Sequence, residues 1–437
     1  MQDILFASVP IHGHVAPLLP LVRHFVQRGD RVRFITGSRF AEAVRDAGAE
    51  HIALTGLADF DDRTVVENLP PGRDGLSPVK AIAFDMEHIF IRPVRDQYAA
   101  VRAALGARPA DALIVDPTFF AGSVIAALPA AERPPVIVAG VLPLSYPSRD
   151  VAPFGTGTPP MPGVLGRLRN AVLATMTRTV VFGRVQRVAD EVQCALIGIP
   201  MGWPFLEWLP HADAVIQLAV PSFEYPRPDA PDTLHFTGPA FAPTSGHGLP
   251  DWWGDLDAAP SVVHVTQGTI ANDDLTELIL PTIRGLAGGD VLVVVSTGGV
   301  PVDRLGELPP NVRAAEFLPY AELFAHTDVF VTNGGYGGTQ FALSHGVPIV
   351  VAPGKEDKVE VAARVAWSGV GINLKTQRPT PDAIAAAVNT VLEEPRFRAA
   401  AQRIGADIEA SPGAAGFAET VDRVIASHSS AHAWARQ

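Results

Sequence analysis

The loop that follows the first apolar segment contains two histidines. Residues 10–17 read Pro-Ile-His-Gly-His-Val-Ala-Pro, so His12 and His14 flank a single glycine. A neutral imidazole in such a loop can take a proton from a hydroxyl group, which is the work of a general base. A loop histidine that only caps or hydrogen-bonds the backbone is the alternative. The segment lacks the GxGxxG pattern, which disfavours a dinucleotide-dependent oxidoreductase.

An aspartate ends another apolar segment of the first half. Asp116 follows the run 112–115, which has the composition of a buried strand. A carboxylate that holds one imidazole nitrogen makes the other nitrogen a better proton acceptor, because it stabilises the imidazolium. We therefore expect Asp116 to lie beside the histidine loop. A role as the cap of the following helix fits the sequence equally well.

The segment 332–340 is the strongest candidate for binding an anion. It reads Thr-Asn-Gly-Gly-Tyr-Gly-Gly-Thr-Gln, with four glycines in five positions. Backbone N–H groups at a helix N-terminus carry about half a positive charge, which suits a diphosphate. A second turn, after the apolar run 262–266, can add a hydroxyl group. The residues expected at the diphosphate are Thr269, Asn333, Gly334, Gly335, Gly337, Gly338 and Thr339.

Strands and helices must position these motifs. Apolar segments of strand length alternate with amphipathic ones, which predicts an α/β protein with parallel sheets covered on both faces. The expected strands are 4–9, 32–36, 51–54, 112–116 and 136–141, then 262–266, 291–296, 329–332 and 348–351. Ligands of open parallel sheets bind at the carboxyl ends of the strands, and the motifs follow such ends.

The pattern also divides the chain into domains. At roughly 150 residues per domain, 437 residues allow two or three domains. Prolines gather among Gly, Ser and Asp in 221–260, which is typical of a linker. We expect a first domain over 1–220, a linker over 221–260 and a second domain over 261–415. A helix over 416–437 should pack back toward the first domain.

Composition excludes several classes of protein. The formal net charge of −12 disfavours a surface that covers nucleic-acid phosphates. The single cysteine, Cys194, excludes an intramolecular disulfide and fits a reducing compartment. No segment approaches the ~20 apolar residues of a membrane span, and no histidine and acid spacing indicates a metal site. We expect a cytoplasmic protein without metal, nucleic-acid or membrane partners, present as a monomer or weak homodimer.

At these motifs the chain resembles the UDP-glycosyltransferases of glycosyltransferase family 1. The segment 13–17, Gly-His-Val-Ala-Pro, is similar to the family's Gly-His-x-x-Pro element, whose histidine is the general base. The resemblance gives that role to His14, leaves His12 without a counterpart and makes Asp116 the residue that orients the base. It also implies the GT-B fold, which consists of two facing Rossmann-like domains, with a C-terminal helix that crosses back to the first domain.

The second half resembles the family's donor-binding elements. The segment 317–320, Phe-Leu-Pro-Tyr, is similar to Trp-x-Pro-Gln. This implies that Phe317 stacks on the nucleobase and that the backbone of Leu318 bonds to it. Asp357 and Lys358 stand where the family has the Asp-Gln pair that holds the donor sugar.

Two positions of the diphosphate element differ from the family. Asn333 stands where the family has a histidine, and its amide N–H can donate to phosphate but carries no charge. Phe341 stands where the family has the glutamate that holds the ribose hydroxyls.

The resemblance implies an inverting glycosyltransferase without a cofactor. The second domain would bind a UDP- or dTDP-sugar as co-substrate, and the first a hydrophobic acceptor such as a polyketide, macrolide or phenol. Aromatic residues could line the acceptor pocket, although their spacing is also typical of a core. These are Phe84, Phe90, Phe119, Phe120 and Tyr146. Two other functions remain open, namely a catalytically silent auxiliary or sugar-nucleotide-binding protein, and a sugar-nucleotide epimerase.

Overall fold

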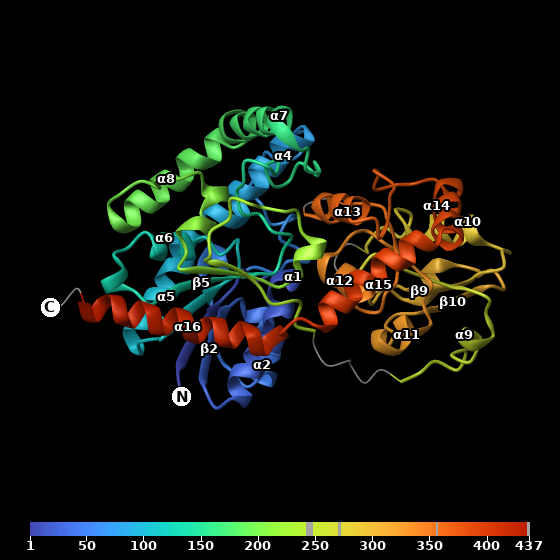
Figure 1. Ribbon diagram of the computed structural model, residues 1–437, viewed down its shortest axis with the longest axis horizontal. Helices are drawn as coiled ribbons and strands as arrows, with labels where there is room; N and C mark the ends of the chain where they lie inside the picture. The colour runs from blue at the N-terminus through green and yellow to red at the C-terminus, as the bar shows by residue number, and fades with distance from the viewer. Residues whose placement is uncertain (242–247, 270–271, 355–356, 435–437) are drawn as a thin grey trace.

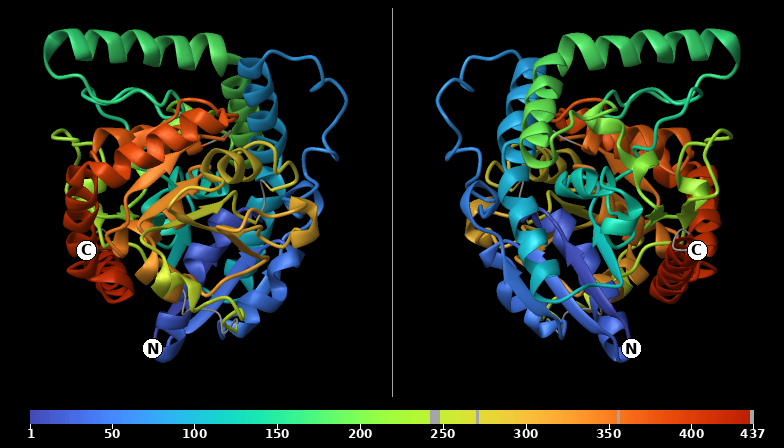
Figure 2. Two further views of the ribbon diagram at one scale, coloured as in Figure 1. Left: turned by 90° about the vertical axis from the view of Figure 1, so that its right-hand side faces the viewer. Right: turned by 90° about the vertical axis from the view of Figure 1, so that its left-hand side faces the viewer.

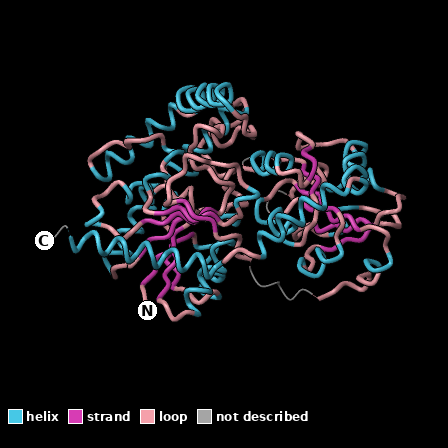
Figure 3. The backbone as a smooth tube through the Cα atoms, viewed as in Figure 1, coloured by secondary structure: helices cyan, strands magenta, loops and turns pink. Residues whose placement is uncertain are grey.

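The computed structural model describes residues 1–241, 248–269, 272–354 and 357–434. Two α/β domains lie side by side, and the N-terminus belongs to the left-hand domain of Figure 1. Figure 3 shows a sheet in each domain, surrounded by helices. The expected α/β architecture with two parallel sheets is confirmed.

The first sheet has seven parallel strands in the order β3-β2-β1-β4-β5-β6-β7. The core strands are buried on both faces, which explains their continuous apolar sequences. The strands are β1 (Asp3–Ala7), β2 (Arg31–Thr36), β3 (Glu50–Ala53), β4 (Ala112–Val115), β5 (Val136–Gly140), β6 (Ala214–Gln217) and β7 (Leu234–Phe236). The helices are α1 (His12–Val15), α2 (Leu19–Gln27), α3 (Ala41–Asp46), α4 (Pro78–Asp85), α5 (Val94–Ala107), α6 (Ala121–Ala126), α7 (Gly163–Met176) and α8 (Gly183–Ile197).

Strand β7 corrects the expected domain boundary. It lies inside the segment 221–260 that the prolines predict to be a linker, yet it pairs with β6 at the edge of the first sheet. The prolines are compatible with this because an edge strand needs backbone donors on one side only. The first domain therefore extends beyond residue 220.

The second sheet has six parallel strands in the order β10-β9-β8-β11-β12-β13. Its edge strands β10 and β13 escape the sequence analysis because each is short and partly exposed. The strands are β8 (Val262–Thr266), β9 (Leu292–Ser296), β10 (Val312–Ala315), β11 (Val329–Thr332), β12 (Ile349–Val351) and β13 (Gly371–Asn373). The helices are α9 (Asp255–Ala258), α10 (Ile279–Leu286), α11 (Tyr320–His326), α12 (Tyr336–Ser344), α13 (Lys358–Trp367), α14 (Pro381–Glu393), α15 (Pro395–Glu409) and α16 (Gly413–Trp434).

Helix α16 crosses back to the first domain, as the sequence predicts. It runs along that domain as the red helix of Figure 1. Phe417 and Val421 are fully buried in the core that includes α2. Arg28 Nη1 also lies 2.7 Å from Asp422 Oδ2. Burial of this helix ties the chain's two ends into one domain.

Buried His264 of β8 makes the stability of the second domain depend on pH. Its ring stacks on Phe330 at 5.3 Å, and Nδ1 lies 3.0 Å from the carbonyl oxygen of Val294. Burial lowers the pKa of His264 from 6.5 to about 4. Between these values the unfolded chain binds a proton that the folded chain does not. The unfolding free energy therefore falls as pH drops through this window, by about 1.4 kcal/mol per unit.

We expect His264→Phe to reduce this pH dependence, because phenylalanine cannot take up a proton. Chemical unfolding of both proteins at several pH values between 7 and 4 measures the effect. The wild-type free energy should fall more steeply than that of the variant. Equal slopes would show that His264 does not contribute.

Candidate active site

The structure brings His14 and Asp116 together. His14 Nδ1 lies 3.0 Å from Asp116 Oδ1, and both side chains are buried. They follow β1 and β4, which are neighbours in register from Ile4 opposite Ala112 to Ala7 opposite Val115. The parallel pairing places the carboxyl ends of the two strands, and hence the two side chains, at one edge of the sheet.

The Asp116 carboxylate is held in its ionised form. Burial alone would raise its pKa, but His14, the Thr118 hydroxyl and the backbone N–H of Val9 together lower the pKa below its usual value. Thr118 Oγ1 donates to Oδ1 at 2.7 Å, and the Val9 N–H donates to Oδ2 at 2.9 Å. A carboxylate at Nδ1 favours the tautomer that carries its hydrogen there, which leaves the lone pair on Nε2 to accept a proton.

The glycine turn of the second domain follows β11. Gly334 adopts φ of 92°, a left-handed conformation that favours glycine, and its N–H lies 3.2 Å from Thr332 Oγ1. Gly335 is the N-cap of α12, Gly337 is exposed and Gly338 is partly exposed. Thr339, in contrast, is fully buried in α12, so its side chain has no surface for a ligand.

Asn333 links the glycine turn to the turn after β8. Its Nδ2 donates to the backbone oxygen of Gln267 at 2.6 Å. An amide NH₂ has two hydrogens, so this bond engages one of them. Thr269, two residues after Gln267, is exposed in the same turn. The two predicted anion-binding turns are therefore neighbours.

Lys358 lies against the glycine turn. A Cβ added to Gly334 would come within 3.4 Å of Lys358 Cβ, and one added to Gly354 within 2.9 Å of Lys358 Cδ. The lysine stem thus crosses two glycines that leave room for it. Asp357 directly precedes it as the N-cap of α13. A lysine at this place brings a positive charge to a turn in which Asn333 is neutral.

Phe317 and Leu318 differ in exposure. The Phe317 side chain is 45% exposed, and Leu318 is buried. A Cβ on Gly299 would lie 3.2 Å from Phe317 Cζ, so the glycine backbone supports one part of the ring. No sequence motif used above indicates the Gly298-Gly299 turn, which supports the Phe317 ring.

Phe341 belongs to an aromatic cluster. Its ring centroid lies 5.6 Å from Phe324, 4.9 Å from His345 and 5.0 Å from Phe241. This packing explains an apolar residue at the position where the family has its ribose-binding glutamate. A phenyl ring in apolar contacts therefore stands where the family has a carboxylate.

The five aromatic residues predicted for the acceptor separate into two groups. Phe119 and Phe120 are almost completely buried in the core of the first domain. This agrees with the alternative that their spacing is typical of core residues. They offer no surface to an acceptor. Phe84 and Phe90 are partly exposed, and the Phe84 ring lies 4.1 Å from that of His88. Tyr146 lines a cavity.

This cavity has a volume of about 510 Å³ and lies between the domains. The loop after β5 forms one wall with Tyr146 and Phe154, and Phe182 and Phe205 add apolar surface. Glu360 and Arg364 of α13 belong to the second domain and also line it. The volume suits a small organic molecule.

A buried polar network connects the glycine turn to this cavity. Tyr336, which lies within the glycine turn, donates its hydroxyl hydrogen to Glu224 Oε1 at 2.9 Å. Arg364 Nε donates to Glu224 Oε2 at 2.8 Å, and Arg364 Nη1 donates to Glu360 Oε2 at 2.8 Å. Glu360 Oε1 accepts the N–H groups of Gly155 and Gly157 from the loop after β5. Glu224 thus bonds to Tyr336 and Arg364 of the second domain, and in this way the network joins the two domains.

The two carboxylates of this network face two arginines, because Arg227 Nη1 also lies 4.0 Å from Glu224 Oε2. Burial lowers the pKa of Arg364, but Glu224 and Glu360 more than offset this, so that the net effect raises it. Burial and Glu224 raise the pKa of Tyr336, which keeps its hydroxyl protonated. No local pattern in the sequence indicates Glu224, Glu360 or Arg364 as members of a network, because each is an ordinary polar residue and Glu224 is far in sequence from its partners.

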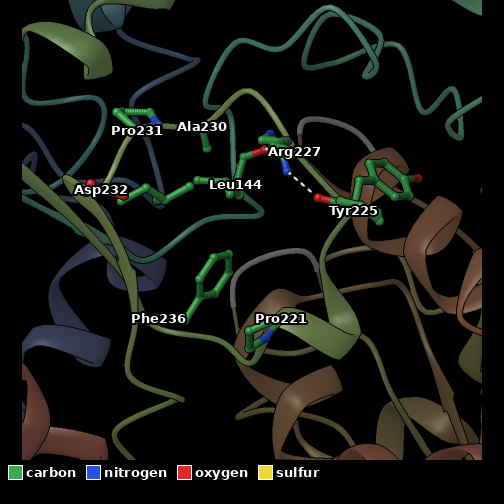
Figure 4. Close-up of a pocket in the computed structure, with 10 residues that line it drawn as sticks. Leu144, Pro221, Tyr225, Arg227, Ala230, Pro231, Asp232 and Phe236 are labelled. Atoms are coloured by element: carbon green, nitrogen blue, oxygen red, sulfur yellow. Dashed lines mark hydrogen bonds between the residues drawn. The ribbon is translucent and has the colours of Figure 1, made fainter.

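A second arginine, Arg227, holds the loop after β5 to the segment that follows β6. Figure 4 shows Arg227 pointing toward Tyr225, with Leu144 beside it. Arg227 Nη1 donates to the Tyr225 backbone oxygen at 3.0 Å, and Nη2 to that of Leu144 at 2.6 Å. The loop after β5 is therefore fastened to the segment that follows β6.

No group of three or more His, Cys, Asp or Glu side chains in the described ranges is arranged to hold a metal ion. None of the helices in those ranges is long and apolar enough to cross a membrane.

Comparison with known proteins places the chain in a class. Residues 282–426 match the family described as "Erythromycin biosynthesis protein CIII-like, C-terminal domain". The chain is 43% identical to 4'-demethylrebeccamycin synthase of Lentzea aerocolonigenes over 406 residues, which cover 92% of this chain and 94% of that protein. It is 36% identical to UDP-glycosyltransferase 2 of Phaeomoniella chlamydospora, with 97% and 96% covered.

Solved structures share the fold. A calicheamicin glycosyltransferase superposes with a TM-score of 0.74 at 24% identity, over 98% of each chain. The glycosyltransferase of kitacinnamycin gives 0.75 at 23% identity, over 97% of this chain and 99% of that one. These structures define the GT-B class of two-domain glycosyltransferases. The chain belongs to the family-1 natural-product glycosyltransferases and is an enzyme of that kind.

Proposed function

We propose that this enzyme transfers a sugar, with inversion, from a UDP- or dTDP-sugar to a hydroxyl group of a hydrophobic small molecule. The observation that carries the proposal is the buried His14–Asp116 pair at 3.0 Å. It lies at the carboxyl edge of the first sheet, and the glycine turn lies at the corresponding edge of the second. A base on one domain and an anion-binding turn on the other suit a reaction that joins two substrates.

The proposed reaction is a single displacement. The acceptor oxygen attacks the anomeric carbon while His14 Nε2 takes the hydroxyl proton, and the bond from that carbon to the diphosphate oxygen breaks. Asp116 stabilises the imidazolium that forms. The N–H groups around Gly335 and Gly337 receive the negative charge of the leaving diphosphate. Attack from the side opposite the leaving group inverts the configuration.

Lys358 is proposed to supply the positive charge that Asn333 lacks. Its stem lies over Gly334 and Gly354, which supports a position near the diphosphate. A charge-assisted hydrogen bond is worth about 1.5–3 kcal/mol. Asp357 would then hold the donor sugar, and Phe317 would stack on the base. Because residue 341 is phenylalanine, it would offer no carboxylate to the ribose hydroxyls.

Lys358→Gln should weaken donor binding with less effect on the chemical step. We expect the KM for the donor to rise roughly 10-fold, because one charged contact to the diphosphate is lost. Steady-state kinetics with the donor varied measures this. The matched control is Lys80→Gln, which removes an exposed lysine of α4 and should leave KM unchanged. An unchanged KM in Lys358→Gln would remove this residue from the donor site.

Relatives support the class of acceptor. One relative is named for the synthesis of 4'-demethylrebeccamycin, and another is a demethyllactenocin mycarosyltransferase of Streptomyces fradiae that is 25% identical. The cavity beside Tyr146 combines aromatic walls with a polar rim, which suits a flat or macrocyclic natural product. We also propose a cytoplasmic enzyme, which the single cysteine supports.

The test is incubation with UDP-glucose or dTDP-glucose and a panel of phenolic, polyketide and macrolide acceptors, followed by mass spectrometry. A glycoside product supports the proposal. Phe341 in place of a carboxylate favours one other function, a sugar-nucleotide-binding protein without activity. Donor binding without any product across the panel would favour that function instead.

A further inference from the structure

Helix α7 presents its apolar side to solvent. Val164 is 81% exposed, Leu165 74% and Leu168 60%, and the stripe continues with Val172 at 51% and Met176 at 52%. At about 100° per residue these side chains fall within an arc of about 120° on the helix. A surface helix normally turns such a stripe toward the core. Figure 2 shows α7 as the green helix along the top of the molecule, with no element above it.

The opposite side of α7 makes the contacts with the protein. Gly166 and Asn170 are buried, and Asn170 Nδ2 donates to the Arg149 backbone oxygen at 3.1 Å. Asn170 and Ala174 also line the cavity between the domains. The helix therefore packs mainly through small and polar residues and leaves its larger apolar residues, except Leu173, exposed.

The exposed apolar surface extends beyond α7. Val180, in the π-helical turn Thr177–Val181 that follows, is 76% exposed. Val79 and Ile82 of neighbouring α4 are each 52% exposed. A surface of this kind marks a place where a partner or a membrane binds.

The charge of the same segment has one sign. Residues 151–189 contain five arginines and no lysine, aspartate or glutamate, although the whole chain carries −12. Arg167 pairs at 2.7 Å with Asp150, which directly precedes this segment, and Arg178 and Arg184 pair with acids from other segments at 2.6 and 2.9 Å. Their side chains are nevertheless 47%, 47% and 72% exposed. A basic amphipathic helix is typical of proteins that bind a membrane surface.

We propose that α7 docks on an anionic lipid surface and lies in its interface, with Leu165 and Leu168 among the acyl chains. The stripe is aliphatic and lacks the aromatic anchors that dominate protein interfaces. The absence of a segment that could span a membrane predicts no membrane partner. An interfacial helix needs no span.

Docking would bring the acceptor cavity to the lipid. The inner side of α7 lines that cavity, so lipid and cavity would be separated by about one helix diameter, roughly 10 Å. An apolar acceptor concentrates in lipid, from which it could reach the cavity. This consequence rests on the proposed function, whereas the docking itself does not.

Co-sedimentation with vesicles tests the docking without any transfer reaction. The probes are phosphatidylcholine vesicles with and without phosphatidylglycerol. We expect binding to the phosphatidylglycerol vesicles that weakens as salt increases. The variant Leu165→Glu/Leu168→Glu should bind at least ~10-fold less, because it loses apolar burial and adds negative charge. Leu249→Glu makes the same kind of change at a leucine that is 57% exposed outside the first domain, and it should bind as the wild type does.

Several outcomes would overturn the proposal. No binding to anionic vesicles would do so, as would equal loss in Leu165→Glu/Leu168→Glu and Leu249→Glu. Light scattering that shows a dimer lost only in the α7 variant would identify a second copy as the occupant instead. Circular dichroism of each variant confirms that it is folded. Since vesicle binding needs no donor, failure of the proposed function leaves this result interpretable.

Discussion

His14→Ala should lower turnover at least ~100-fold while donor binding persists. In the proposed reaction the acceptor hydroxyl then has no positioned base, because Asp116 is buried and held by other groups. The donor would be bound by the second domain, so its affinity does not depend on this ring. Single-turnover kinetics and calorimetric titration with UDP measure the two quantities separately.

His12→Ala is the matched control for this prediction. His12 lies two residues away on the same short helix, its side chain is exposed and its backbone N–H, which the substitution keeps, donates to Asp62. We expect its turnover to stay within a few-fold of the wild type. The turnover of Asp116→Asn should lie between those of the two histidine variants, because the amide no longer stabilises an imidazolium. Equal turnover of the His14 and His12 variants would remove His14 as the base.

Arg364→Met should strongly destabilise the enzyme. The substitution leaves buried Glu360 without its cation and leaves Glu224 with only Arg227, 4.0 Å away. Removing one partner of a buried ion pair costs about 3–5 kcal/mol. The loop after β5 would also lose the Glu360 geometry that holds Gly155 and Gly157. Urea unfolding, followed by fluorescence, gives the change in unfolding free energy.

Two further variants make this prediction specific. Arg396→Met removes an arginine whose side chain is 69% exposed and pairs with Glu394, and it should cost less than about 1 kcal/mol. Tyr336→Phe removes only the hydroxyl that donates to Glu224, and we expect a loss of about 1–3 kcal/mol. If Arg364→Met were no more destabilising than Arg396→Met, the network would not join the domains as described.

The sequence predicts the parts of this enzyme that depend on local pattern. Buried parallel strands have continuous apolar runs, so nine strands follow from the pattern of apolar segments. These are β1 to β5, β8, β9, β11 and β12. The proximity of His14 and Asp116 is expected as well, because His14 lies in the segment after β1 and Asp116 directly follows β4. The glycine turn is recognisable from its four glycines before any contact is known.

Contacts between distant segments cannot be predicted in this way. Glu224 meets Arg364 across 140 positions of sequence, and no local pattern indicates that either is buried. Phe119 and Phe120 show the converse problem, since an aromatic pair after a strand can face a core or a ligand, and packing decides. The outward apolar side of α7 is equally hidden, because its spacing alone predicts a core-facing helix.

The configuration of the product tests the central claim most directly. UDP-glucose carries its leaving group in the α configuration, and NMR of the anomeric proton determines the linkage of the glycoside formed by the wild type. Direct displacement assisted by His14 predicts a β-glycoside, whose formation is lost in His14→Ala. An α-glycoside, or an undiminished yield from His14→Ala, would contradict the account.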